Sequence, residues 1–402
     1  MKQHKNAREG MALPIAMLSI VVIGALLAGA FFASTQEFRS GRNTLVQQRA
    51  FSVAEYGLNY EISHWDRSRN VPGGMRVGVI DSSRVFVADG DTARVRISRL
   101  NDNTFWVVSE GSAAMGNAQT RSMARTNMFV RIAYPVVAAG GAITTAGNLS
   151  IGGNARISGG DSLPPAWSRD STRNGNCTGM TQRDTFVVAA GLLATVDSSS
   201  RNLIGSGTNN DSMRVSRSAI NVDSNTYVRY GSETWESLRR NADVTIPNGG
   251  DVSPFPAGSD STCNYADRNN WGEPHRSWPD TVSTNTYVAG CRGYFPIVYV
   301  DGDLHVNRQS RGQGILLVNG DLTFNGGFEW NGLIIVRDDI ERGNGNAEIY
   351  GSIMSRNADL SDRSSDLRGT TTIRYSRCAL ENALRGSAIL IPAKHRSWAQ
   401  FF

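Results

Sequence analysis

The fold is decided by the stretch from Met11 to Gln36, which reads MALPIAMLSIVVIGALLAGAFFASTQ. None of these 26 residues is charged, and about 20 apolar residues are enough to span a bilayer as a helix. An ordinary secretory signal has a shorter apolar core followed by a small-residue cleavage site, and this stretch meets neither criterion. We therefore predict a transmembrane helix over residues 11–36.

The ten residues before this stretch set its orientation. They read MKQHKNAREG, in which Lys2, Lys5 and Arg8 outweigh Glu9. Because basic residues are retained on the cytoplasmic side of a membrane, residues 1–10 are predicted to be a cytoplasmic leader. The bulk of the chain, beyond the helix, is then predicted to lie on the opposite side after a single crossing.

A helical pattern continues beyond the membrane segment. Spacings of three or four residues separate Phe51, Ala54, Leu58, Ile62 and Trp65, which places them on one face of an α-helix. A single helix over residues 11–65 would be a rod of about 80 Å, apolar in its first half and amphipathic in its second. A rod of this kind suits lateral assembly.

Two short segments carry a family resemblance. They are REGMAL at residues 8–13, where the leader meets the helix, and AFSVAEYGL at residues 50–58. Over residues 1–65 this layout resembles the PilX-type minor pilins among the type IV pilin-like proteins. The resemblance implies that prepilin peptidase cleaves after Gly10 and that the new N-terminus, Met11, is methylated. Major pilins carry a glutamate at the fifth mature position, whereas Ile15 stands here, as is common in minor pilins and pseudopilins.

The function that this resemblance implies is structural. The chain would be a minor pilin-like subunit of a type IV pilus or a related secretion filament, contacting other pilin-like subunits through its N-terminal helix. It would be anchored once in the bacterial inner membrane with its bulk in the periplasm, and it would reach the cell surface within a filament. A tip role and a priming role both stay open, as does the identity of any surface ligand.

After the helix the apolar period changes from 3.6 to 2. Charged and apolar residues alternate from Arg94 to Arg99, the apolar run Phe105–Val108 follows a turn, and alternation returns from Met128 to Ile132. These patterns predict a small antiparallel sheet over residues 66–135.

Two later regions repeat. The hexapeptides AITTAG, NLSIGG and NARISG fill residues 142–159, and further on the repeat is three hexapeptides long. Residues in step at intervals of 18 are Val300, Val318, Val336 and Met354, and likewise Leu304, Leu322, Ile340 and Ala358. Such periods are typical of parallel β-solenoids, whose stacked coils bury a continuous apolar column. We predict a solenoid resembling that of bactofilins over residues 136–160 and 292–376.

The predicted fold class is therefore α+β: a long N-terminal helix, a small antiparallel sheet and a parallel β-solenoid with an insertion. The insertion, residues 161–291, is rich in Ser, Asn, Asp, Arg and Gly but holds several aromatic residues, and is predicted to be ordered and loop-rich. Residues 377–402 are predicted to be a C-terminal helix and tail.

Four cysteines lie beyond the membrane segment: Cys177, Cys263, Cys291 and Cys378. None has the short spacing of zinc or thioredoxin-like sites, so an even number in this compartment predicts two disulfides. Four cysteines allow three pairings, which the sequence does not decide between. The more local pairing, Cys263 with Cys291, is favoured, and it leaves Cys177 for Cys378.

No catalytic, cofactor-binding or metal site is predicted. The five histidines are far apart and lack the partners of known motifs, and His305 is expected to point outward from its coil. Aspartates at the coil corners, such as Asp303 and Asp321, are expected to bond the backbone of their own turn rather than to hold Ca²⁺. All but three of the 41 basic residues are arginines dispersed among acidic ones, so the net charge of +5 does not predict a nucleic-acid partner.

Two alternatives accompany the pilin-like function. One is a membrane-anchored, bactofilin-like scaffold that polymerises through its solenoid. The other, less favoured, is a cell-envelope carbohydrate-active enzyme. Processing at Gly10 separates the pilin-like subunit from the scaffold, and hydrolytic activity of residues 70–402 would indicate the enzyme.

Overall fold

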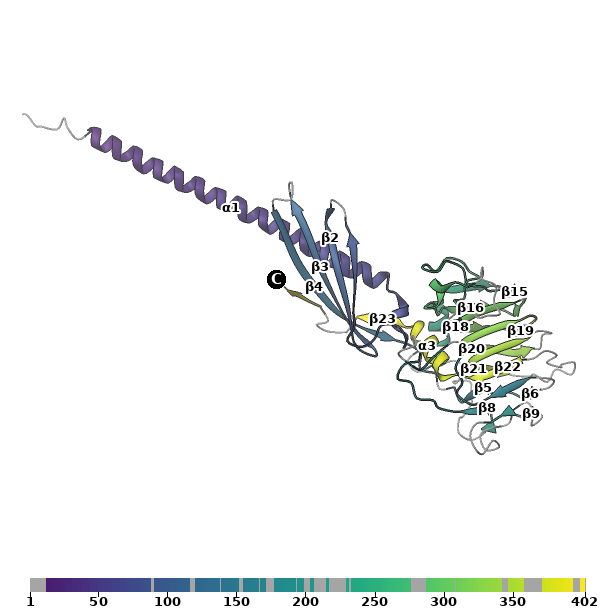
Figure 1. Ribbon diagram of the computed structural model, residues 1–402. Coiled ribbons are helices and arrows are strands. Elements are labelled where there is room, and N and C mark those ends of the chain that lie inside the picture. The colour runs from purple at the N-terminus through teal and green to yellow at the C-terminus, as the bar shows by residue number, and fades with distance from the viewer. Residues whose placement is uncertain are drawn as a thin grey trace, which may run out of the picture.

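The computed structural model shows three parts in chain order: a long helix, an antiparallel sheet packed on the second part of this helix, and a stack of parallel strands (Figure 1). It describes residues 12–87, 90–115, 120–137, 139–151, 155–165, 167–170, 177–192, 194–198, 203–205, 215–216, 229–230, 233–275, 287–307, 309–341, 346–357, 371–392 and 398–401.

Helix α1 spans Ala12–Ser63, 52 residues without a break, so the prediction of one continuous rod is confirmed. Its end is followed by Asp66, whose side chain accepts a hydrogen bond from the backbone N–H of Ser68 and caps a short 3-10 helix, Arg67–Arg69. The first part of α1 projects away from the rest of the molecule, and the last part lies along the sheet (Figure 1).

The antiparallel sheet lies where the alternating pattern predicted it. Its inward residues, among them Val95, Ile97, Phe105 and Val107, are fully buried, while the residues between them face outward. The strands are hydrogen-bonded in chain order as β1 (Ile80–Phe86), β2 (Thr92–Asn101), β3 (Thr104–Met115) and β4 (Thr120–Ala133).

The C-terminus returns to this sheet, which corrects the prediction of a tail after the last helix. Beyond α3 (Arg377–Gly386), strands β23 (Ile389–Pro392) and β24 (Trp398–Phe401) both pair antiparallel with β4. At 14 residues β4 is long, and its outer edge would otherwise present unpaired backbone groups. The last residues therefore complete the sheet.

The 18-residue step is the register of the parallel stack. Residues opposite one another are Val300, Val318 and Val336 in one sheet and Leu304, Leu322 and Ile340 in another. All of them are buried in one apolar core. The strands are β16 (Ile297–Asp301), β18 (Ser310–Val318), β20 (Phe328–Glu341) and β21 (Ala347–Asn357), with β17 (Leu304–Val306) and β19 (Leu322–Phe324) in the second sheet.

The fourth copy of the repeat is displaced from the predicted alignment. Gly332 lies opposite Gly351 and Ile335 opposite Met354, so the step from β20 to β21 is one residue longer than 18. A shift of one residue turns a side chain to the other face of a sheet. Met354 accordingly packs with Ile335 on the outer face, not with Val336 in the inner core, and its predicted position was wrong. Ala358 lies outside the described residues.

Each hexapeptide of residues 142–159 supplies one strand. Ile143 lies opposite Ile353 of β21, and Ile157 lies opposite Ile373 of the strand that follows β21. The two repeat regions, far apart in the sequence, are therefore neighbours in one sheet. The strands are β5 (Gly141–Thr145), β6 (Leu149–Ile151), β7 (Arg156–Ser158) and β22 (Thr371–Tyr375).

The stack also extends into residues 161–291, which corrects the prediction of an insertion over this whole range. Strands β8 (Phe186–Ala190), β9 (Val196–Ser198), β10 (Leu203–Ile204) and β11 (Val215–Ser216) continue it beyond β5, β6 and β7. At the other end β14 (Val244–Pro247) and β15 (Gly250–Val252) pair with β16 and β17. The connections between these strands differ in length, so no fixed sequence period reveals them.

Smaller elements complete the described part of this range. Helix α2 spans Trp235–Arg240, and Thr234 and Ser237 cap it reciprocally. Strands β12 (Arg229–Tyr230) and β13 (Glu233–Thr234) precede it as a hairpin, and a 3-10 turn covers Ala289–Cys291.

Aspartates link successive turns of the stack at its corners. Asp303 Oδ1 accepts the backbone N–H of Asp321 at 2.9 Å, and Asp321 Oδ1 accepts that of Asp339 at 2.8 Å. The expectation that these carboxylates bond their own turn was therefore wrong, because each acceptor serves the residue 18 positions later. In the part of the chain that the structure describes, no three His, Cys, Asp or Glu side chains converge to hold a metal ion.

Helix α3 covers the outer face of the stack and leads to the antiparallel sheet. Its apolar residues Leu380, Ala383 and Leu384 pack with Leu333 and Ile335 of β20. Gly332 lies under α3, where a Cβ would come within 2.9 Å of Ala383. The close approach of α3 to β20 thus depends on the glycine at this position.

We expect Val318→Asp to lower the free energy of unfolding by several kcal/mol, because it would place an unpaired carboxylate between Val300 and Val336 in the core. His305→Ala should lower the free energy of unfolding by less than about 0.5 kcal/mol. His305 is only partly buried, because it faces the side of the strand opposite to the buried Leu304 and Val306. Chemical denaturation of the full chain in detergent measures both. Equal destabilisation by the two variants would contradict the assigned register.

Candidate functional site: the N-terminal helix and the contacts that orient it

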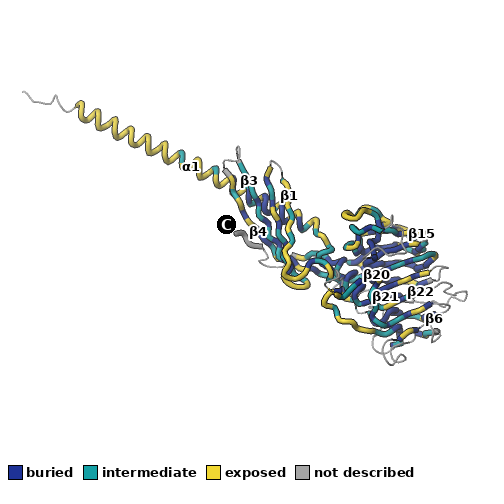
Figure 2. The backbone as a smooth tube through the Cα atoms, viewed as in Figure 1, coloured by how far each residue is buried: buried dark blue, intermediate teal, exposed yellow. Residues whose placement is uncertain are grey.

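The first part of α1 is not covered by any other described part of the chain. Figure 2 shows it as a continuous exposed rod. By length and composition it could cross a membrane. The exposed large apolar side chains are Leu13, Ile15, Met17, Leu18, Ile20, Val21, Val22, Ile23, Leu26, Leu27, Phe31 and Phe32. Such an area requires lipid or other helices around it.

The hydroxyl groups of this segment are satisfied by the helix itself. Ser19 Oγ donates to the carbonyl of Ile15 and Thr35 Oγ1 to that of Phe31, each at 2.8 Å. A hydroxyl bonded to the carbonyl four residues earlier needs no partner from outside. The segment can therefore enter hydrocarbon without leaving these donors unpaired.

The predicted processing site, Gly10 and Met11, lies outside the described residues. Ile15, five residues after Gly10, is on the helix with 58% of its surface exposed.

The second part of α1 approaches the sheet very closely. A Cβ at Gly57 would overlap the Cβ of Ala93 and approach Ser109 Oγ to 2.8 Å, and a Cβ at Gly111 would overlap the backbone of Ala50 and Ala54. Small residues on both sides let the helix backbone lie directly on the strands. The helix therefore lies closer to the sheet than it could if large side chains stood at these positions.

The predicted apolar face of the helix is largely the one that packs. Ala54 and Leu58 are buried, and Phe51, Ile62 and Trp65 are partly buried against the same apolar clusters. The sequence did not indicate the remaining contact residues, which are Val46, Ala50, Val53, Gly57 and Glu61. Small residues such as Ala50 and Gly57 contribute little to the apolar periodicity of the sequence, although the helix comes closest to the strands at these residues.

Charged contacts fix the helix at both ends of this interface. At its membrane-side end, Arg49 Nε lies 2.6 Å from Asp91. At the other end, the buried carboxylate of Glu61 accepts Ser83 Oγ at 2.6 Å and pairs with Arg69 at 2.9 Å. Because Glu61 is buried, both partners are needed to offset its desolvation.

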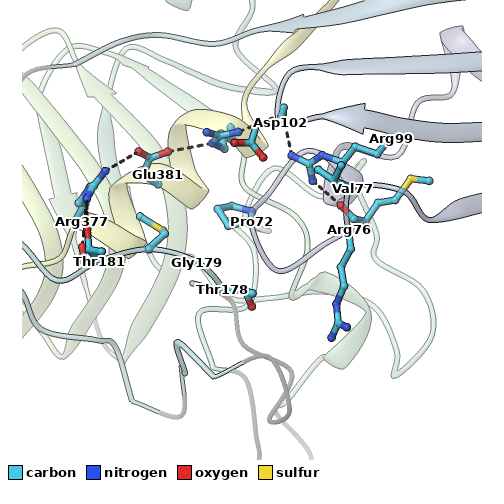
Figure 3. A pocket seen from close by; sticks show the side chains of 13 residues that line it. Pro72, Arg76, Val77, Arg99, Asp102, Thr178, Gly179, Thr181, Arg377 and Glu381 are labelled. Carbon is cyan, nitrogen blue, oxygen red and sulfur yellow. Dashed lines mark hydrogen bonds and ion pairs between the residues drawn. The ribbon is translucent and has the colours of Figure 1, made fainter.

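A cleft of about 430 Å³ lies where the sheet, α3 and the loop before β1 meet (Figure 3). Arg99 is buried here and donates to the carbonyls of Met75 at 2.6 Å and Asp102 at 2.9 Å. Burial, together with the charge of Arg385, lowers the pKa of Arg99 from its ordinary value. On α3, Glu381 lies between Arg377 and Arg385, at 4.0 and 3.0 Å. Arg385 of α3 also donates to the carbonyl of Asp102 at 3.3 Å, and this contact joins α3 to the sheet.

The four cysteines form two disulfides, in the pairing that the sequence favoured. Cys263 is bonded to Cys291, with Cα atoms 4.8 Å apart, and Cys177 to Cys378, with Cα atoms 5.5 Å apart. The second bond attaches the loop before β8 to the first turn of α3. It thus links two positions of the stack that are 201 residues apart and holds the loop against α3.

A buried ionic cluster beside the stack escaped sequence reasoning. His275 lies 2.8 Å from Glu329 and 3.1 Å from Glu273, and Glu273 also pairs with Arg311 at 2.8 Å. Burial by itself would lower the pKa of His275, but the two carboxylates outweigh it and raise the pKa to about 9. The only sequence signal was the aromatic setting of NWGEPHRSW at residues 270–278.

Gly57→Ala should destabilise the protein by about 1–3 kcal/mol, because the added methyl group forces α1 away from β2. Gly41→Ala is the matched control in the same helix, since a Cβ there has nothing within 4 Å. The control should be neutral or stabilising by up to about 1 kcal/mol through helix propensity. Urea denaturation of the full chain in detergent compares them. Similar effects of both substitutions would contradict the close packing described.

The His275 cluster predicts a pH dependence. Because the pKa of His275 is raised in the folded state, its stabilisation is complete below the ordinary pKa of 6.5 and is lost as the pH rises through about 9. The free energy of unfolding should therefore fall over this window, by at most about 3 kcal/mol. His275→Gln should flatten that part of the profile. An unchanged slope in the variant would mean that other groups cause it.

No protein-family model matches this chain, and no curated protein matches it significantly. A similar solved structure is that of the competence-associated pilin ComZ from Thermus thermophilus, with 15% identity over 89% of this chain and 97% of that chain and a TM-score of 0.24. A likeness at this TM-score assigns neither fold nor function to the chain.

Proposed function

We propose that this protein is a minor pilin-like structural subunit of a type IV pilus or a related secretion filament. The observation that carries the proposal is that one unbroken helix, Ala12–Ser63, is bare and apolar in its first part and packed on its own sheet in its last part. A simple anchor needs no rigid continuation into the folded part. A filament subunit does, because its head must keep a fixed position relative to the helix that packs with neighbours.

In this proposal the leader is removed by prepilin peptidase between Gly10 and Met11, and Met11 is methylated, as in PilX-type minor pilins. Before assembly the subunit crosses the bacterial inner membrane once, with the sheet and stack in the periplasm. Its partners are other pilin-like subunits, which contact the exposed apolar side chains of α1. The two disulfides suit an oxidising compartment. Neither catalysis nor a cofactor forms part of the proposed role.

The stack of parallel strands would be the exposed head. We assign it to the β-solenoid class because opposite residues recur every 18 positions in two of its sheets. A head of this size, lying between Gly141 and Gly386, is too bulky to repeat at the close spacing of a major pilin. The subunit is therefore proposed to be of low copy, at the tip or in priming. Ile15 fits this role, since a carboxylate without a partner is costly in hydrocarbon.

One observation favours a second candidate, the anchored bactofilin-like scaffold. β14 is the terminal strand of the 14-stranded sheet, so one of its edges has no strand partner in the described part of the chain. A second copy could pair there by strand addition. In that case α1 would serve only as an anchor.

Cleavage between Gly10 and Met11 is the expected result in a host that has prepilin peptidase. Mass spectrometry of the mature N-terminus measures it. Replacing Gly10 by a bulky residue such as leucine should block processing and entry into filaments, while Gly29→Leu, which alters an exposed helix position, should leave processing intact.

Mature protein that still begins at Met1 in such a host would refute the pilin-like proposal. The amount of subunit in sheared, purified filaments then separates the remaining roles. Trace stoichiometry supports a tip or priming subunit, abundance equal to the major pilin contradicts it, and absence from filaments favours the anchored scaffold.

A further inference from the structure

The outward face of the antiparallel sheet collects arginines that are dispersed in the sequence. Alternation along β1, β2 and β4 turns six of them to the side opposite α1, and Glu110 of β3 is the carboxylate that accompanies them among the described residues of this face. This face therefore carries as much net charge, +5, as the whole chain. The arginines are Arg84, Arg94, Arg96, Arg121, Arg125 and Arg131.

Part of this charge makes no ion pair with a carboxylate among the residues that the structure describes. Arg84, Arg94, Glu110 and Arg125 lie opposite one another across β1 to β4. Glu110 is 2.6 Å from Arg125 and 3.9 Å from Arg96. Arg84 and Arg94 are like charges directly opposite on adjacent strands, an arrangement that destabilises a sheet. Glu110 lies opposite Arg94 on its other side but is paired with Arg125 and Arg96, so a bound anion would offset the remaining repulsion.

The charge is concentrated at the end of the sheet that faces the membrane segment. There Asp91, just before β2, pairs with Arg49 of α1, and Gly111 lies against Ala50. The next row of the face toward the same end contains Phe86 and Met123, which are 74% and 63% exposed. The two exposed apolar side chains thus lie next to the row that contains Arg84, Arg94 and Arg125, and Arg121 lies on the other side of Met123 along β4.

This end of the sheet lies within reach of the bilayer that α1 would cross. Arg49 comes 13 residues after Gln36, about 20 Å along a helix. Transmembrane helices tilt by up to about 40°, and a tilt toward the sheet lowers its outward face toward the headgroups. Attraction between exposed charges acts over about 10 Å at ordinary salt, so contact becomes favourable within the usual range of tilt.

We propose that this surface, formed by Arg84, Arg94, Arg121, Phe86 and Met123, docks on anionic lipid headgroups while the protein stands in the membrane outside a filament. Guanidinium groups bind phosphate oxygens through paired N–H donors, and Phe and Met side chains suit the boundary between headgroups and acyl chains. The proposal needs α1 to cross a bilayer but does not depend on filament entry, so it can fail or succeed independently of the proposed function.

The test uses the full chain in lipid nanodiscs with a nitroxide label at Met123→Cys. Labelling is selective because the four native cysteines are in disulfides. Accessibility of the label to a water-soluble nickel complex should fall at least twofold when one third of a phosphatidylcholine bilayer is replaced by phosphatidylglycerol. About 0.5 M salt should reverse the change. A label at Leu192→Cys, exposed on the stack, should show no lipid dependence.

Substitution of arginines decides whether their charge is responsible. The triple variant Arg84→Gln, Arg94→Gln and Arg121→Gln should lose the lipid dependence, and the corresponding lysine variant should retain it, which a purely structural role would not predict. The matched control changes three exposed arginines of the stack to glutamine, namely Arg240, Arg268 and Arg292.

Three outcomes would overturn the proposal. They are equal accessibility in neutral and anionic discs, lipid dependence that persists in the glutamine variant, and loss of lipid dependence in the stack control. Binding of a labelled oligonucleotide through the same three arginines in detergent, without any lipid effect, would assign the surface to nucleic acid instead.

Discussion

The close approach of α1 to the antiparallel sheet is the contact on which the rest of the arrangement depends. Gly57 and Gly111 leave no room for a methyl group, so the helix has one position on the strands. The ion pairs of Arg49 and Glu61 hold the two ends of this interface. A bare apolar rod is useful to an assembly only if the folded part stays in a fixed relation to it, and this packing provides that relation.

The stack obeys a different constraint. Its core is built by repetition, in which equivalent residues of successive turns lie above one another. At the corners, the side chain of an aspartate in one turn accepts a hydrogen bond from the backbone of the next turn. Such a structure can be extended without changing the residues near the membrane. The helix α3 and the disulfide Cys177–Cys378 attach it to the sheet. Two parts with separate cores are thereby joined, with polar contacts of Arg385 with Asp102 and of Arg67 with Asp243 between them.

The features that could be predicted from the sequence are those in which the same type of residue recurs at a fixed interval. The apolar run of α1, the alternating strands and the step of 18 residues each repeat the same residue type at a fixed interval, and the structure contains all three. Met354 was misplaced because a single extra residue changes the face without disturbing the apparent pattern. Strands β8 to β11 were missed because unequal connections hide their period, and the return of β23 to β4 leaves no local sign at all.

The candidate site was predictable to a similar degree. The exposed helix follows directly from its composition, and the favoured cysteine pairing is the one present. The arginine-rich face could not be predicted, because its members are far apart in sequence and meet only through the register of four strands. The ionic cluster of His275 likewise combines residues from three segments. Neither arrangement has a sequence period.

The pairing of Ala133 with Ile389 has a mechanical consequence. The chain leaves the antiparallel sheet for the stack at the end of β4 and returns at the start of β23, and these two residues lie opposite each other. A pull on the stack therefore enters the sheet through two adjacent strands at the same end. The force runs along β4 and is resisted by many of its hydrogen bonds with β3 at once, in shear, so the bonds are not peeled apart one after another. A subunit that bears tension between a surface and a membrane would benefit from this geometry.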